Sequence, residues 1–221
     1  PTLPQLVCRC GSTCYPGAGE AGLARERDGG GHRPAHSVRE APVRLSSDVY
    51  WRELVGAAFM VVLGSALHFA FELSGGWRPL AIVAAVNESI WEHLKLAFWP
   101  GLLWAAVVRL SPGAERREVL AIKGISLAII AVLIVVVFRS YTSILGRNLL
   151  ILDIGTFVLA ICVGQMISAW LLTRSGLLPK LVFWPGTLLL VLQVLAYGTF
   201  TYFPPDHWLF IEARTGQLGI E

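Results

Sequence analysis

Apolar residues are gathered into five long blocks that cover most of the chain after about its first fifty residues. The blocks lie at about 51–73, 79–110, 118–140, 148–173 and 180–203. A helix needs about 20 apolar residues to cross a bilayer core of about 30 Å, and each block has that length. Backbone groups in lipid must bond within their own segment, so the blocks are predicted to be helices. The pattern therefore predicts an all-α fold, a polytopic membrane helix bundle.

The second block is unusually long and contains a proline. As one continuous helix, residues 79–110 would measure about 48 Å at about 1.5 Å per residue, which is too long for one straight crossing. Pro100 lacks an amide donor and crowds the preceding turn. We therefore expect a kink or break near Phe98–Gly101, with 80–97 as a polar-faced helix inside the protein and 101–110 completing the crossing. The bundle then has five transmembrane helices, or six if this block counts twice.

Residues 1–48 differ in composition from the rest of the chain. They are rich in glycine, proline, arginine and acidic residues and have almost no apolar periodicity, so they cannot bury enough surface to offset their chain entropy. We predict a disordered N-terminal segment at 1–48 and a transmembrane helical domain at 49–221. One interpretation is that translation starts near Val49 and that the preceding residues are not native. The segment's C-x-C-x3-C pattern lacks the second tight pair of a zinc site, which disfavours a metal there.

Composition and charge narrow the functional class. Hydrophobic residues make up 55% of the chain and charged residues 15%, whereas soluble domains have about 25% charged residues. The net charge is +3, but the basic residues stand in short clusters beside the apolar blocks, which argues against nucleic acid as a partner. Their distribution predicts a multi-pass protein of the cell (plasma) membrane, with a cytoplasmic N-terminus and the C-terminus outside. The lipid bilayer is the expected partner, a homo-oligomer is left open, and the small-molecule or ion substrate is unknown.

Ionisable residues stand inside the first two blocks, where charge is costly. Each such residue costs roughly 2.5–3.5 kcal/mol on insertion and is a candidate for function. His68 and Glu72 are four residues apart and share a helix face, and Glu88 and Glu92 do the same in the stretch VNESIWEHLKL. If the two blocks form a hairpin about the turn SGGWR, their polar faces can meet. The predicted pocket consists of His68, Glu72, Asn87, Glu88, Glu92, His93 and Asp153.

Several interpretations of this pocket are open. Imidazole and carboxylate groups bind divalent transition metals, and the candidate metal ligands are His68, Glu88, Glu92 and His93. A bound metal would allow hydrolysis by activating a water molecule. The same groups could instead relay protons or solutes, or only neutralise one another, as Glu92 and Lys95 would. His68 and His93 could also be axial haem ligands, although the surrounding carboxylates argue against haem.

The sequence identifies no catalytic residue. Ser89 stands four residues before His93, but no G-x-S-x-G, Walker or H-E-x-x-H motif occurs. The favoured function is a small-solute or proton-coupled transporter, because a broken second block suits a wet interior path. The alternative is a metal-dependent membrane-embedded enzyme that resembles a hydrolase, with a divalent transition metal as its cofactor.

Four stretches resemble a family of uncharacterised bacterial integral membrane proteins. They are LHFAFELSGG, VNESIWEHLKLAFWP, YTSILG with DIGTF, and TYFPP with TGQLGI. The family is a domain of unknown function marked by a NES-x-WEHLK core, and the resemblance covers about residues 50–220. Its tail reads PPH…LF-x-DP-x-TG-x-YG, whereas here Asp206 precedes His207 and Glu212-Ala213 replaces the Asp-Pro pair. The resemblance implies no activity and only sharpens the set of candidate residues.

Overall fold

The fold is built from helices throughout the part of the chain that is described. The structure is a computed structural model that describes residues 44–110, 118–174, 177–212 and 215–220, with side chains at 44–46 and 177–178 outside the described set. Its elements are α1 (Arg44–Leu73), the short 3-10 helix η1 (Arg78–Ile82), α2 (Ile90–Leu110), α3 (Val119–Leu145), α4 (Leu150–Thr173) and α5 (Leu177–Thr199). In these ranges the only strand-like feature is the bridge between Ile211 and Leu218. The predicted all-α fold is confirmed for the described residues.

The first helix begins earlier than the predicted block. Helix α1 starts at Arg44, two residues after Pro42, and prolines commonly stand at or just before helix starts. Residues 44–48, which the sequence assigned to the N-terminal segment, are therefore helical. The prediction of disorder for residues 1–43 lies outside the described residues.

A kink or break was predicted near Phe98–Gly101, and the break is wrong, because α2 runs through Pro100 without interruption. Proline at this position removes the hydrogen bond to the carbonyl of Leu96. That carbonyl lies against Gly64 of α1, where a Cβ atom would approach the Leu96 oxygen to 2.6 Å. The glycine therefore lets α1 pack closely against the freed carbonyl.

The irregular part of the second block lies instead at residues 83–89, just before α2. Ser89 is the residue before the helix, and its hydroxyl oxygen accepts a hydrogen bond from the Glu92 amide at 3.4 Å. A serine followed three residues later by glutamate is a common signal for a helix start. The second block is therefore divided by a helix cap rather than by its proline.

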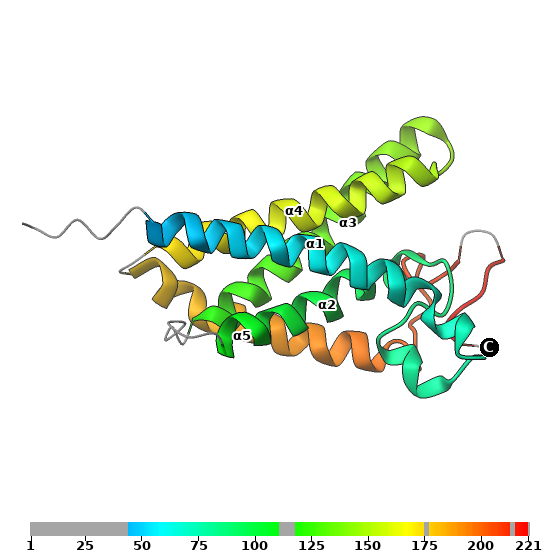
Figure 1. Ribbon diagram of the computed structural model, residues 1–221. Helices are drawn as coiled ribbons and strands as arrows, with labels where there is room; N and C mark the ends of the chain where they lie inside the picture. The colour runs from blue at the N-terminus through cyan, green and yellow to red at the C-terminus, as the bar shows by residue number, and fades with distance from the viewer. Residues whose placement is uncertain (1–43, 111–117, 175–176, 213–214, 221) are drawn as a thin grey trace, which may run out of the picture. The chain divides into compact units, whose positions relative to one another are not determined.

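Successive helices run in opposite directions, and α3 packs against α2, α4 and α5, while α1 packs against α2 and α4 (Figure 1). The C-terminal ends of α1 and α5, the start of α2, and η1 meet at one end of the bundle (Figure 1). Residues 200–212 and 215–220, here called the C-terminal segment, lie at the same end. The fold therefore brings two distant parts of the sequence, about 73–90 and 199–220, to one place.

Four of the described helices are long and apolar enough to cross a membrane. They are Ser47–Leu73, Val119–Leu145, Leu150–Thr173 and Pro179–Thr199. Their outward surfaces carry large apolar side chains, such as Val62, Ile151 and Trp184, that are more than two-thirds exposed. Helix α2 is not in this group and has a largely buried first half. The count of five spans stays a prediction.

Glycines allow α3 and α5 to approach closely. A Cβ atom on Gly186 would lie 2.1 Å from the Ala121 carbonyl oxygen, and one on Gly124 would lie 2.2 Å from the Gly186 carbonyl oxygen. Small residues of this kind set the distance between packed membrane helices. Gly198 lies on α5 like Gly186, but a Cβ atom there would meet nothing within 4 Å.

This contrast gives a matched pair of variants. We expect Gly186→Ala to destabilise the bundle by about 1–3 kcal/mol, because the added methyl group forces the two backbones apart. Gly198→Ala should leave stability almost unchanged. Thermal unfolding of the detergent-solubilised protein checks both, and equal midpoints for the two variants would contradict the packing described.

Candidate functional site

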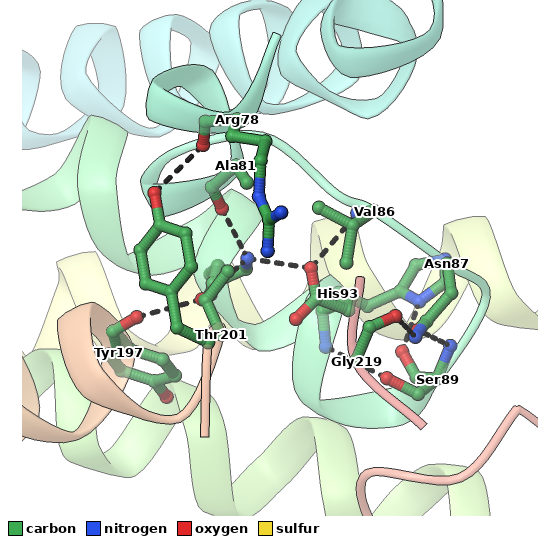
Figure 2. A network of polar contacts seen from close by, with 12 residues as sticks. Arg78, Ala81, Val86, Asn87, Ser89, His93, Tyr197, Thr201 and Gly219 are labelled. Atoms are coloured by element: carbon green, nitrogen blue, oxygen red, sulfur yellow. Dashed lines mark hydrogen bonds and ion pairs between the residues drawn. The ribbon is translucent and has the colours of Figure 1, made fainter. Parts of the chain in front are cut away.

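The site is organised around a buried ion pair. Lys95 Nζ lies 2.6 Å from Glu92 Oε2, and the two side chains are 0% and 3% exposed. Lys95 also donates to the Ala81 carbonyl at 2.7 Å and to the Thr201 hydroxyl at 2.9 Å. An ammonium group has three donors, so these three partners satisfy it fully. Ala81 and Thr201, its partners from η1 and from the chain after α5, are labelled in Figure 2.

The ion pair also holds the irregular segment before α2. Glu92 Oε2 accepts a second hydrogen bond, at 3.0 Å, from the Val86 amide. The pair therefore fixes the backbone at both Ala81 and Val86, and through Thr201 it fixes the end of α5. It matches the predicted neutralisation of Glu92 by Lys95, but its contacts reach well beyond one helix.

Asn87 ties the same segment to the C-terminal segment. Its Nδ2 donates to the Gly219 carbonyl at 3.1 Å, and its Oδ1 accepts from the Ser89 amide at 3.0 Å (Figure 2). Nearby, the Trp91 amide donates to the Leu209 carbonyl at 3.0 Å. The residue between Asn87 and Ser89 is thus held at a defined position.

That residue, Glu88, meets two histidines. Its Oε2 atom lies 3.4 Å from His93 Nε2 and 3.8 Å from His68 Nε2. One ligand atom from each of the three residues lies within 4.8 Å of the others. The three side chains are part-exposed, between 29% and 52%. Helix α1, the irregular segment and the first turn of α2 each contribute one residue to this cluster, here called the His–Glu–His cluster.

The other nitrogen of His93 is held by the backbone. His93 Nδ1 lies 2.9 Å from the Ser89 carbonyl oxygen. A carbonyl only accepts hydrogen bonds, so Nδ1 donates to it, and Nε2 is the nitrogen that faces Glu88. This is the arrangement that metal-binding histidines use, in which the second nitrogen bonds to a backbone carbonyl.

An open hollow of about 510 Å³ lies beside the cluster. His68 and Glu88 line it, together with Glu72, Asn87 and the rings of Phe69 and Phe71. Glu72 is exposed and faces the hollow without belonging to the cluster. A ligand in the hollow would therefore meet carboxylate and imidazole groups on one side and aromatic surface on another.

Two of the predicted pocket residues lie apart from both the cluster and the hollow. Glu92 is turned to Lys95, although the sequence made it a candidate metal ligand, because adjacent helix residues point about 100° apart. Asp153 lies at the α3–α4 turn, where it accepts a hydrogen bond from Tyr141 and one from Asn148 at 3.4 Å. The predicted pocket therefore divides into a cluster, a structural ion pair and a separate turn.

Haem does not suit the two histidines. Their ring centroids lie 5.2 Å apart, edge to face. Axial haem ligands must stand on opposite sides of an iron and its macrocycle, whereas these two rings contact each other and both Nε2 atoms face the Glu88 carboxylate. The imidazoles share one cluster instead.

A second buried polar network was missed by the sequence analysis. Lys123 forms an ion pair and hydrogen bond with Glu53 and donates to Gln165 Oε1 at 2.8 Å, so it joins α1, α3 and α4. Glu53 and Lys123 are 0% and 1% exposed. The sequence does carry a signal for this network, because the charged residues Glu53 and Lys123 both stand inside apolar runs.

Removing one partner of the central ion pair should be costly. In Lys95→Met, Glu92 stays buried without its cation, and we expect a loss of about 3–5 kcal/mol in stability. Glu92→Gln/Lys95→Met should be less destabilised than Lys95→Met alone, because it removes the buried unpaired charge. Thermal unfolding in detergent measures this, with Lys180→Met as the exposed-lysine control. A double variant less stable than Lys95→Met would contradict the role of the pair.

The comparisons with known proteins find a family but no assigned activity. A search of curated proteins and a search of solved structures each find no match. A family model described as a family of unknown function matches residues 43–220. The expected membership of a family without an assigned activity is confirmed, whereas its membrane nature and bacterial origin stay predictions. The chain belongs to the family of unknown function DUF6512.

Proposed function

We propose that the chain is an integral membrane protein with a divalent-metal site at one end of its helix bundle. The ligands are His68, Glu88 and His93, and the bound metal serves hydrolysis. The observation that carries the proposal is the convergence of the two Nε2 atoms on Glu88 Oε2.

Two imidazole nitrogens and one carboxylate oxygen face one another in the cluster. The two nitrogens lie 3.4 and 3.8 Å from the same Glu88 oxygen. Separate N–H donors would account for each contact on its own, whereas a metal ion would bond to all three atoms at once. We propose the metal because the donor set is one that transition metals prefer.

The distances suit a small transition metal. Zinc binds histidine nitrogen and carboxylate oxygen at about 2.0–2.2 Å, so ligand atoms of a tetrahedral site lie about 3.3–3.6 Å apart. The separations of 3.4 and 3.8 Å need only small side-chain shifts to reach this range. Two histidines and one carboxylate form a donor set that zinc uses in hydrolases.

Three protein ligands leave a coordination position for water or substrate. The hollow beside His68 and Glu88 supplies the space for such a group. A metal in this setting lowers the barrier to hydrolysis by activating water and polarising the bond that breaks. Glu72 faces the same hollow and can accept a proton or contact the substrate.

The site lies near a membrane surface under this proposal. His68 stands five residues before the end of the candidate span Ser47–Leu73, which is a depth of about 7.5 Å along the helix. With a cytoplasmic N-terminus, this end faces the non-cytoplasmic side. Trp77 follows the span and is 61% exposed, as is common for tryptophan at the bilayer interface.

Metal content tests the site directly. The full chain, purified in detergent without chelators and dialysed against zinc, should hold about one equivalent of zinc by elemental analysis. His93→Ala and Glu88→Gln should lose it, because each removes one of three ligands. His207→Ala is the matched control, since this exposed histidine lies outside the cluster. Zinc retained at wild-type level in both ligand variants would contradict the proposal.

Hydrolysis is tested with the same proteins. The zinc-loaded protein should release nitrophenolate from p-nitrophenyl acetate faster than His93→Ala does, by at least about tenfold, which corresponds to 1.4 kcal/mol of barrier. If the wild-type protein holds zinc but releases nitrophenolate no faster than His93→Ala, the site binds a metal and the proposed hydrolysis is contradicted.

Transport is the second candidate function and rests on a separate observation. The buried network of Glu53, Lys123 and Gln165 joins three helices within candidate spans, and Glu53 Oε1 has no hydrogen-bond partner among the described residues. Ionisable groups inside membrane-spanning helices often mark ion or proton paths.

For a transporter, proteoliposomes should take up protons faster than empty vesicles under an imposed pH gradient. Lys123→Met should lower this rate at least about tenfold, since it removes the central group of the network, whereas Lys180→Met should not. A pH-sensitive dye inside the vesicles measures the uptake. Wild-type vesicles no faster than empty ones would contradict proton transport.

A further inference from the structure

We propose that the C-terminal segment positions the metal ligand Glu88, and that Asn87 is the positioning residue through which it does so. This inference rests on the metal site proposed above. Its consequence is that metal binding and docking of the C-terminal segment stabilise one another.

The ligand Glu88 stands on backbone that has no regular structure of its own. Residues 83–89 form neither helix nor strand, so the neighbours of Glu88 must be held by side chains and by other segments. Val86 is held by Glu92, and Ser89 is held by Asn87. Asn87 therefore closes a turn around Glu88, with its own oxygen bonded to the residue beyond it.

The amide nitrogen of Asn87 connects this turn to the C-terminal segment. It donates to the Gly219 carbonyl at 3.1 Å (Figure 2). One side chain thus makes both contacts, one within the ligand turn and one to a residue 132 positions away. Moving Gly219 would change the orientation of the Asn87 amide and hence the turn that carries Glu88.

Gly219 is itself fixed by its surroundings. Its φ is 75°, a left-handed conformation that favours glycine. A Cβ atom there would lie 2.9 Å from Pro204 Cγ. Substitution at this position should therefore displace the carbonyl that Asn87 binds, without altering any residue of the His–Glu–His cluster.

The rest of the C-terminal segment is anchored close to the cluster. The Glu212 amide donates to the Gln217 carbonyl at 3.0 Å, so the segment folds back on itself. Leu209 accepts from the Trp91 amide, and the Trp91 and Phe210 rings lie 4.6 Å apart. Trp91 stands two residues before His93, so the segment contacts both sides of the ligand turn.

Thermodynamic linkage turns this geometry into a measurable coupling. If docking of the segment favours the metal-binding position of Glu88, then metal binding must favour docking by the same factor. Groups that orient metal ligands typically change metal affinity by 10–100-fold when removed. A residue that only supports folding would show no such reciprocal effect.

The experiment uses the full chain in detergent and measures zinc affinity by competition with a chromogenic chelator. We expect Asn87→Ala and Gly219→Ala each to weaken zinc binding about 10–100-fold, and the double variant to lose little more than either alone. Asn148→Ala, at the α3–α4 turn, is the control and should bind like the wild type. Cobalt absorption spectra of the variants should retain the wild-type coordination type, because the three ligands remain.

Amide hydrogen exchange supplies the reciprocal measurement. Zinc should slow exchange at residues 209–212 and 215–219 in the wild type and have little effect in Asn87→Ala. Affinities within about twofold of the wild type in both single variants, or exchange that zinc does not change, would overturn the inference while leaving the metal site intact. A wild-type protein that binds no zinc would instead overturn the proposed function and this inference with it.

Discussion

The buried ion pair between Glu92 and Lys95 is the constraint on which this end of the bundle depends. Two charges without access to water cost several kcal/mol each unless every lone pair and proton is matched. Lys95 therefore requires the Ala81 carbonyl and the Thr201 hydroxyl, and Glu92 requires the Val86 amide. These requirements fix η1, the irregular segment and the end of α5 relative to α2.

The same constraint explains why a polar cluster can form beside it. The ion pair holds the backbone on one side of Glu88, and Asn87 with the C-terminal segment holds it on the other. His68 lies on α1. The close approach of α1 to α2 depends on Gly64, which lies opposite the Leu96 carbonyl. These contacts thus present a part-exposed set of imidazole and carboxylate groups beside an open hollow, as the proposed metal site requires.

Much of the helical architecture could be predicted, because long apolar runs leave a backbone in lipid few alternatives. The polar faces of the first two blocks were expected to meet, and His68 does lie beside Glu88 and His93. The connection between the two helices spans residues 74–89, however, and not the short turn alone. The break was misplaced because Pro100 was given more weight than the cap at Ser89, and the role of Gly64 needs the tertiary structure. Contacts such as Asn87 with Gly219, or Glu53 with Lys123, join residues 70 or more positions apart, and no local pattern specifies them.

X-ray absorption at the zinc edge of the zinc-loaded full chain tests the central claim most directly. The account predicts a first shell of nitrogen and oxygen at about 2.0–2.2 Å, with the outer-shell scattering of two imidazole rings. A shell of sulfur at about 2.3 Å, or a spectrum without imidazole scattering, would contradict it.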